Sequence, residues 1–231
     1  YVMDTVFGHT LHGWSDFPDN QLLRCPLHKK YEANLILGCP LNTVFLDVGA
    51  HYGDTCLTMA LYAKKNGRDD IRFFAFEPNA RKCKHIKNIA KLNKLPIKVY
   101  NACVGDVSGA YAVAYGDWDS RLGCCAFVES NVGKVRTICL DDILLENRGN
   151  IIMHIDVEGW EPKVLRGAHN LLNNAMSSTV IVECWTSEQS IERGFSNTPE
   201  KDILHDSFSS WDNNTYLLMF FSTHQFQLQT Q

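Results

Sequence analysis

Two acidic residues lie at places in the sequence where a carboxylate can bind a ligand. Asp47 interrupts an apolar run, and Glu77 directly follows the next apolar run along the chain. Gly49 and Gly53 bracket the turn after the first run, where glycine lets the backbone approach a ligand closely. Ligands of an open parallel sheet bind beyond the carboxyl ends of its strands, where a carboxylate can accept hydrogen bonds from ribose hydroxyls. The spacing therefore predicts a nucleoside site, with Glu77 on the ribose.

The charge of Asp47 and the number of glycines indicate which nucleoside would bind. A carboxylate beside the turn would repel a pyrophosphate but attract the positively charged amino group of S-adenosylmethionine. The third glycine of the dinucleotide-binding pattern G-x-G-x-x-G is missing. We therefore expect S-adenosylmethionine as the cofactor. A NAD-dependent oxidoreductase and a catalytically silent nucleoside-binding module remain competing interpretations.

A second group of ionisable residues, His154, Asp156 and Glu158, alternates along a later apolar run. In an unbroken strand all three would point to one face. Methyl transfer from a sulfonium is an in-line displacement in which the protein aligns the acceptor oxygen, and a base can take the proton of the alcohol. Asp156 is the first candidate for that base, ahead of Glu158 and His154. In the competing interpretation, the two acids cap the next helix or pair with Lys163 and Arg166.

Three further residues suit an acceptor. Glu183 closes the next apolar run and Trp185 follows at the same face, so that a carboxylate and an aromatic ring are available to a sugar. Trp160 is a second candidate ring, although large aromatic side chains more often pack in a core. The acids, together with His154, could instead hold a divalent cation that orients two hydroxyls. No spacing resembles a dedicated cation loop, and we predict no metal site.

The elements that must position these residues alternate between short β-branched or aromatic runs and helical patterns, as in a parallel sheet covered by helices. The expected strands span residues 43–48, 71–76, 97–103, 151–157 and 179–185. A helix follows each of the first two strands, with buried faces made by Cys56, Met59, Ala60 and Ala63 and by Cys83, Ile86, Ile89 and Ala90. Asp54 or Thr55 is expected to cap the first of these helices.

The later part of the chain departs from this rhythm. One helix is expected at residues 161–174 and another near residues 199–208. Additional strands at residues 111–115 and 135–139 are separated by a loop around residues 118–133. Strands at residues 216–221 and 224–228 follow each other directly, which predicts an antiparallel hairpin at the end of the chain.

Several sequence blocks together resemble the FkbM-type methyltransferases. They are L-D-V-G-A-H-Y-G, F-E-P-N, V-G-D-V-S-G, L-D-D-I-L, I-D-V-E-G-W-E-P-K-V-L-R-G-A and V-I-V-E, in this order between Val44 and Glu183. The resemblance implies an α/β, Rossmann-like class I methyltransferase fold with a mostly parallel seven-stranded sheet and helices on both faces. It also implies S-adenosylmethionine as methyl donor and transfer to a hydroxyl oxygen, often of a sugar or a polyketide.

The resemblance assigns donor-binding roles to individual residues. Asp47, Gly49 and Gly53 match the donor loop, which here also contains Tyr52 and Thr55, and Glu77 matches the ribose-binding acid. His51 stands where such proteins often have asparagine, and it could donate to the donor's carboxylate or face the acceptor.

The adenine ring needs a slot rather than a charge, and the end of the third strand is the usual place for it on this architecture. Cys103 and Val104 occupy that position here. Asp106 could receive the adenine amino group, or could be a turn residue before Ser108 and Gly109.

The composition is that of an ordinary globular protein. The chain has 231 residues, 45% of them hydrophobic, and a formal charge of −4, so it carries no basic footprint for nucleic acid. No apolar run approaches the roughly 20 residues of a membrane span. Nine cysteines without a C-x-x-C pair predict free thiols in a reducing compartment and hence a cytoplasmic protein. Nothing in the sequence indicates an oligomeric state.

We expect a single methyltransferase domain over residues 1–231, one that could be cut from a larger polypeptide because the chain opens at Tyr1. Within it, residues 1–42 form an N-terminal extension that could face the acceptor, and residues 106–150 form an insertion.

Overall fold

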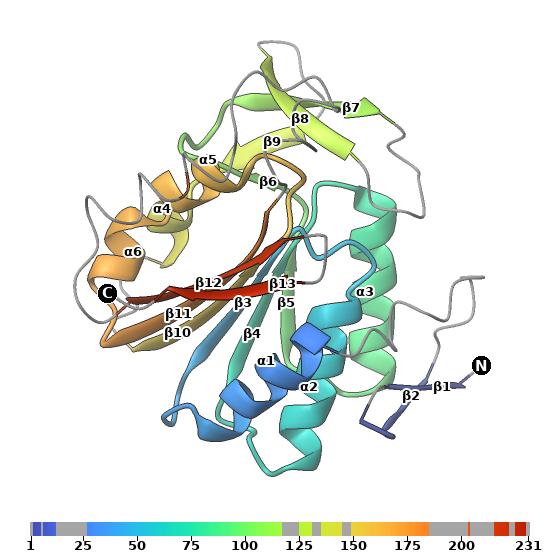
Figure 1. Ribbon diagram of the computed structural model, residues 1–231. Coiled ribbons are helices and arrows are strands. Elements are labelled where there is room, and N and C mark those ends of the chain that lie inside the picture. Colours follow the sequence, from blue (N-terminus) through green and yellow to red (C-terminus); the bar gives the residue numbers. More distant parts are fainter. Residues whose placement is uncertain are drawn as a thin grey trace. The chain divides into compact units, whose positions relative to one another are not determined.

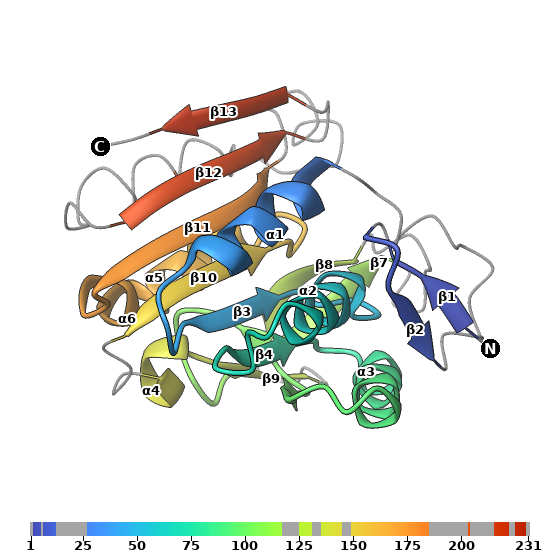
Figure 2. The same cartoon turned by 90° about the horizontal axis from the view of Figure 1, so that it is seen from below.

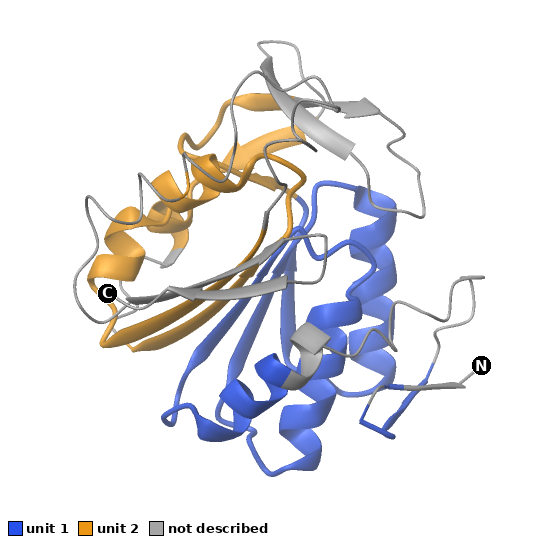
Figure 3. Cartoon of the chain, in the orientation of Figure 1, with its two compact units in different colours: residues 1–101 blue, residues 102–231 orange. Residues whose placement is uncertain are grey.

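The computed structural model of the protein describes residues 2–5, 7–12, 27–116, 125–130, 135–144, 149–184, 203, 215–221 and 225–229. The chain divides into two compact units, unit 1 with residues 1–101 and unit 2 with residues 102–231, shown in blue and orange in Figure 3. The single domain expected over residues 1–231 stays a prediction. Trp185 and, apart from Ile203, the helix predicted near residues 199–208 lie outside the described residues.

Unit 1 is built around three parallel strands, with β4 (Arg72–Phe76) between β3 (Val44–Val48) and β5 (Ile97–Tyr100). In the register of these strands, Asp47 pairs with Ala75, and Phe76 pairs with Tyr100. Every side chain of β3 is buried. A parallel strand covered on both faces needs a nearly continuous apolar run, which is the pattern that predicted this strand. The predictions of β3 and β4 are confirmed.

The helices α2 (Asp54–Lys65) and α3 (Ala80–Leu92) lie side by side next to β4 (Figures 1 and 2). Their predicted apolar faces are confirmed, because both sets of four residues are buried: Cys56, Met59, Ala60 and Ala63 in α2, and Cys83, Ile86, Ile89 and Ala90 in α3. Asn79 caps α3, since its side chain accepts hydrogen bonds from Arg81 N at 2.9 Å and Lys82 N at 3.3 Å. Both helices therefore begin close after the carboxyl end of a strand.

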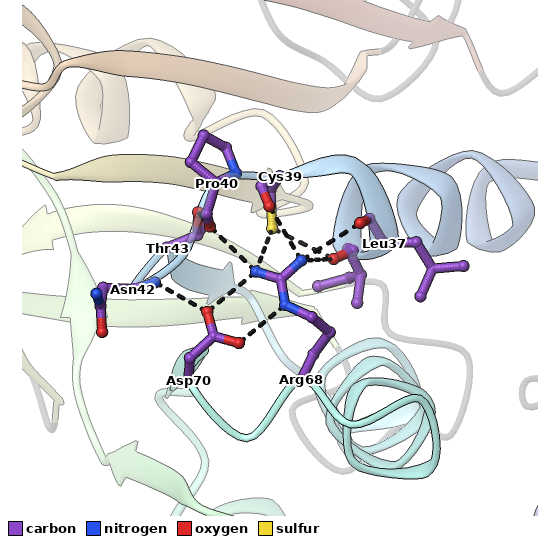
Figure 4. Close-up of polar contacts among 8 residues, drawn as sticks. Leu37, Cys39, Pro40, Asn42, Thr43, Arg68 and Asp70 are labelled. Carbon is purple, nitrogen blue, oxygen red and sulfur yellow. Dashed lines mark hydrogen bonds and ion pairs between the residues drawn. The ribbon is translucent and has the colours of Figure 1, made fainter.

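The connection from α1 (Leu27–Gly38) to β3 is held by Arg68, which follows α2 (Figure 4). Its guanidinium donates to the carbonyl oxygens of Ile36 at 2.8 Å and of Cys39 and Pro40 at 3.0 Å. Asp70 pairs with the same guanidinium, Nε to Oδ1, at 2.8 Å, and the hydrogen bonds from Arg68 lower the pKa of Asp70 to about 2. Because α1 has no basic residue in its last turn, Arg68 supplies the positive charge and the donors that a helix end requires.

The described N-terminal residues form a small hairpin of β1 (Val2–Asp4) and β2 (Thr10–His12). His12 exchanges two hydrogen bonds of 2.9 Å with the side chain of Asn93, the residue that follows α3. The Phe7 ring lies 4.4 Å from the ring of Tyr62 in the second half of α2. This hairpin therefore contacts the C-terminal parts of α2 and α3, whereas the turn after β3 lies at the N-terminal end of α2. An acceptor-facing role of residues 13–26 lies outside the described residues.

Unit 2 contains the strands β10 (Asn150–Ile155), β11 (Ser177–Cys184), β12 (Thr215–Phe221) and β13 (Gln225–Gln229). The pairs β10–β11 and β11–β12 are parallel, whereas β12 and β13 are antiparallel (Figure 2). The predicted antiparallel hairpin at the end of the chain is confirmed. Parallel strands joined by helices occur in both units, so that the predicted α/β class is confirmed as well.

The single helix predicted at residues 161–174 is wrong, because the structure has two short helices, α5 (Glu161–Arg166) and α6 (His169–Asn173). The break falls at Gly167, where a Cβ atom would overlap the carbonyl oxygen of Gly105. Asp141 N donates to the carbonyl of Gly167 at 2.9 Å, and the Asp141 carboxylate accepts from Leu171 N at 2.7 Å. These two hydrogen bonds to Asp141 occupy the carbonyl of Gly167 and the amide of Leu171, which would bond to each other in a continuous helix.

The predicted insertion, residues 106–150, contributes three strands to a second sheet, β7 (Tyr111–Gly116), β8 (Cys125–Ser130) and β9 (Val135–Ile138), followed by α4 (Leu140–Leu144). The sheet is completed by β6 (Cys103–Val104), which precedes the insertion, and has the order β6-β9-β7-β8. The additional strands predicted at residues 111–115 and 135–139 are confirmed. A continuous loop around residues 118–133 is wrong, since β8 pairs with β7.

The third strand predicted at residues 97–103 is too long. β5 ends at Tyr100, and Cys103 pairs with Thr137 of β9 instead. Asn101 interrupts the strand, because its side-chain amide donates to the carbonyl oxygens of Glu77 at 3.1 Å and Pro78 at 2.7 Å.

Candidate functional site

Asp47 lies near the end of β3, only 1% exposed, and its Oδ2 atom accepts a hydrogen bond from Cys56 N at 2.9 Å. Cys56 belongs to the first turn of α2, whose N-cap residue is Gly53. The predicted capping by Asp54 or Thr55 is therefore wrong. A carboxylate from the preceding strand takes over this task, and its negative charge is favourable at the positive end of a helix.

The turn between β3 and α2 is held by backbone hydrogen bonds within unit 1. Gly49 N and Ala50 N both donate to the carbonyl oxygen of Phe76 at 3.0 Å, and Gly53 N donates to Ala50 O at 2.6 Å. Gly49, His51 and Gly53 have positive φ angles of 86°, 51° and 88°. A Cβ on Gly53 would also lie 2.8 Å from Leu57 Cδ1. The glycines predicted to allow close approach of a ligand thus permit, in the first place, close packing of the turn.

Glu77 lies directly after β4 and bridges two segments. Its Oε2 accepts from His51 N and its Oε1 from Asn79 N, both at 2.8 Å. The side chain is 5% exposed. Burial raises the pKa of Glu77 to about 7, the charge of Asp47 adds to the rise, and Lys82 and the two amides oppose it. A carboxylate has about four acceptor positions, so each oxygen can still accept a hydrogen bond from a hydroxyl group.

The aromatic and basic neighbours of this turn form a cluster around Tyr52, which is 5% exposed. The ring of Tyr52 meets the rings of His51 at 4.6 Å and of His85 at 5.5 Å edge to face, and Lys82 Nζ lies 5.3 Å from its centroid. Thr55 is also buried, in the first turn of α2. Direct contacts of His51, Tyr52 and Thr55 with a cofactor stay predictions.

The residues predicted to form an adenine slot belong to unit 2. Cys103 and Val104 are buried in β6, where they pair with Thr137 and Ile138 of β9. The carboxylate of Asp106 accepts from Arg166 Nε at 3.2 Å. The structure therefore gives Asp106 an ion-pair partner, and its contact with an adenine amino group stays a prediction.

The acids of the second predicted group follow β10, which ends at Ile155. Asp156 is the first residue beyond the strand, and Glu158 has a φ angle of 55° in the turn that follows. The prediction that His154, Asp156 and Glu158 share a face of one unbroken strand is therefore wrong, because the strand ends before the alternation is complete. His154 remains inside β10 and is 8% exposed.

The electrostatics nevertheless connect these residues within unit 2. Burial raises the pKa of Asp156 well above its ordinary range, and the negative charges of Glu183 and Glu158 raise it further, while His154 opposes the rise. Glu183 is partly exposed near the end of β11. A carboxylate with a raised pKa is a stronger base than an ordinary one, which suits proton removal from a hydroxyl.

Glu161 is a further residue of this region, which the sequence reasoning missed. It is 2% exposed, and its Oε1 accepts from Val157 N at 3.1 Å and Gly159 N at 3.2 Å. Burial raises the pKa of Glu161 to about 7. A signal was present in the sequence, because a glutamate in the first turn of a helix can reach back to amides before the helix. Glu161, rather than Asp156 or Glu158, provides this contact.

The two candidate tryptophans differ in what the structure describes. The Trp160 ring is 7% exposed, with Lys163 Nζ 4.5 Å from its centroid, and a Cβ on Gly105 would lie 3.3 Å from its Nε1. These contacts are those of a packed core residue, and binding of an acceptor by Trp160 stays a prediction that they do not support. The role predicted for Trp185 cannot be placed, since this residue lies outside the described part of the chain.

Two general predictions concern metals and membranes. Among the described residues, no group of three or more histidine, cysteine, aspartate or glutamate side chains could hold a metal ion. Within the same residues, no helix is long and apolar enough to cross a bilayer. Cys39, Cys56, Cys83 and Cys139 carry free thiols.

Comparison with known proteins identifies a family. The family model described as "Methyltransferase FkbM domain" matches residues 47–213, well over half of the chain. The matched region begins at Asp47 and includes Glu77 and all the acids that follow β10. No curated protein matches the chain significantly.

Proposed function

Because the chain belongs to the methyltransferase FkbM family, we propose that it transfers the methyl group of S-adenosylmethionine to a hydroxyl oxygen, most simply that of a sugar or glycan. The observation that carries the choice of a hydroxyl acceptor is the environment of Asp156, which is buried next to other acids. Its pKa is raised by burial and by the charges of Glu183 and Glu158. A carboxylate of this kind can accept the proton that an alcohol releases as its oxygen is alkylated.

The residues of unit 1 fit a nucleoside donor. S-adenosylmethionine supplies a methyl group already activated by its sulfonium. Glu77 would hold the ribose, since both its oxygens are oriented by backbone amides at 2.8 Å and retain acceptor capacity. Asp47 would contribute negative charge beside a cationic donor, and it also fixes the start of α2. The side chain of Asp47 is only 1% exposed. Its direct contact with the donor's amino group stays a prediction.

The residues of unit 2 fit the handling of a hydroxyl. In this proposal Asp156 accepts the proton, and Glu158 and Glu183 keep its pKa high through their negative charge. Glu183 would also accept hydrogen bonds from neighbouring hydroxyls of the acceptor. A sugar offers several such hydroxyls on one ring. A polyketide or another small molecule with fewer hydroxyls is the alternative acceptor.

The donor part of the proposal is tested by calorimetric titration with S-adenosylhomocysteine and with NAD. We expect heat of binding with the first compound only. Binding of NAD alone would favour an oxidoreductase and overturn the proposal.

The acceptor part is tested with a panel of glycans, isotopically labelled S-adenosylmethionine and mass spectrometry. Label incorporated into a glycan is the expected result. Donor binding without label in any glycan or polyketide of the panel would favour a catalytically silent nucleoside-binding module. A cytoplasmic location and the lack of a nucleic-acid partner rest on cysteine usage and charge and stay predictions.

A further inference from the structure

Glu161 has no part in the transfer as proposed so far, yet its side chain accepts two hydrogen bonds from the turn that carries the acids. The residue lies at the first position of α5 and is 2% exposed. Its Oε1 atom accepts from Val157 N at 3.1 Å and from Gly159 N at 3.2 Å. A single oxygen atom therefore ties α5 to the residues on both sides of Glu158.

The backbone of this turn is one that few residues adopt without support. Glu158 and Gly159 are successive residues with φ angles of 55° and 97°. Positive φ is uncommon for a residue other than glycine, and it persists where surrounding contacts over-determine the conformation. The two hydrogen bonds to Glu161 bracket Glu158 and provide such contacts.

A packing role alone would not require a carboxyl group at this position. Burying a carboxyl is costly, and burial raises the pKa of Glu161 to about 7. Its neighbours Pro162, Val164 and Leu165 are buried and could be joined by an apolar side chain at no such cost. What an apolar side chain lacks is an acceptor for the two amides, which would otherwise lose their partner.

We propose that Glu161 is a positioning residue, which holds residues 157–159 in one conformation and thereby fixes where the carboxyls of Asp156 and Glu158 lie. The inference rests on the proposed function, in which Asp156 is the base. A misplacement of about 1 Å at a catalytic group can reduce turnover by about 100-fold. Loss of Glu161 should therefore affect transfer, whereas Asp47 and Glu77, which belong to unit 1, keep their hydrogen bonds and donor affinity.

The test compares Glu161→Met with Glu161→Gln in the full chain. Both variants remove the charge, but only the glutamine keeps an oxygen that can accept from both amides. In Glu161→Met we expect hydrogen exchange at Val157 N and Gly159 N to accelerate about tenfold or more. The Asp156 titration, followed by carbon NMR of its carboxyl, should shift by about one pH unit relative to Glu161→Gln. Glu161→Gln should retain slow exchange.

The outcome that overturns the positioning role is equal exchange and equal titration of Asp156 in the two variants. If Glu161→Met does not fold, Glu161→Asp takes its place, since it keeps the charge but shortens the side chain. Exchange and titration as in the wild type would then overturn the proposal.

Transfer assays separate this proposal from the function on which it rests. Full transfer by Asp156→Asn would remove the proposed base and leave the exchange result standing. Equal transfer by Glu161→Met and Glu161→Gln, with a loosened turn only in the former, would remove the positioning role alone.

Discussion

The turn after β3 and the turn after β10 are both held by carboxylates that accept hydrogen bonds from backbone amides. After β3, Asp47 binds Cys56 N and Glu77 binds His51 N, so that the acids expected to meet the donor also order the turn. After β10 the tasks are divided, because Glu161 binds the turn, while burial and then its acidic neighbours raise the pKa of Asp156. In the proposed function, the first turn would bind the donor and the second would carry out proton transfer.

The largest effect is expected from Asp156→Asn. Removal of a general base typically costs 10²–10⁴-fold in turnover, so we expect the rate of methyl transfer to fall at least about 100-fold. The affinity for S-adenosylhomocysteine should stay within about twofold of the wild type. The substitution removes an interaction that acts only in the transition state, so binding in the ground state is unchanged. Asp142→Asn, at an exposed position of α4, is the matched control and should transfer normally. A comparable loss in the control would show that the assay reports on charge or folding instead.

The pH dependence of the free energy of unfolding allows a direct comparison of the buried carboxyls at the two turns. Glu77 and Glu161 both have a pKa raised by burial to about 7, so the folded chain binds these protons more tightly than the unfolded chain. Each group therefore makes the folded state more stable at pH 5 than at pH 8, by about 2 kcal/mol, and this contribution is lost as the pH rises through about 7.

Urea unfolding at the two pH values measures this difference. It should shrink by about 2 kcal/mol in Glu77→Gln and in Glu161→Gln alike. An unchanged difference in one variant would mean that the corresponding carboxyl is ionised normally and that the two turns are not alike in this respect.

Gly53→Ala tests the close packing of the first turn. The new Cβ would lie 2.8 Å from Leu57 Cδ1 and 2.9 Å from Ile86 Cγ1, at a φ angle of 88°. Gly67→Ala has a similar φ angle of 73° but open space around the Cβ, so it isolates the backbone strain. In thermal or urea unfolding, we expect the free energy of unfolding to fall by about 1–2 kcal/mol more in Gly53→Ala than in Gly67→Ala. Equal losses would mean that the turn yields easily to the added methyl group and is not closely packed around Gly53.

Glu77→Gln tests the contribution of the turn after β3 to donor binding. Loss of a charged acceptor for ribose hydroxyls is expected to weaken S-adenosylhomocysteine binding about tenfold at pH 8. In the wild type the affinity should fall as the pH drops below about 7, because a protonated Glu77 accepts fewer hydrogen bonds. The variant should show no such dependence in calorimetric titrations between pH 6 and 8. A pH dependence that survives the substitution would point to another titrating group.

The turn after β3 is predicted better from the sequence than the turn after β10, for a physical reason. Apolar runs and glycine spacing located β3, β4 and the turn between β3 and α2, since these features depend on burial and local conformation. In the turn after β10, Val157 N and Gly159 N donate to the side chain of Glu161 on the following helix. The break of the helix at Gly167 depends on Gly105, which is far away in the sequence. Such contacts carry little periodic signal along the chain.

The central claim, methyl transfer from S-adenosylmethionine to a hydroxyl with Asp156 as the base, is tested most directly by identifying the methylated atom. The wild type and Asp156→Asn would be incubated with isotopically labelled S-adenosylmethionine and the glycan panel, and labelled products would be examined by NMR. We expect a labelled methyl ether on a sugar oxygen, made by the wild type and nearly absent with the variant. A methyl group on nitrogen or carbon, or equal ether formation by both proteins, would contradict it.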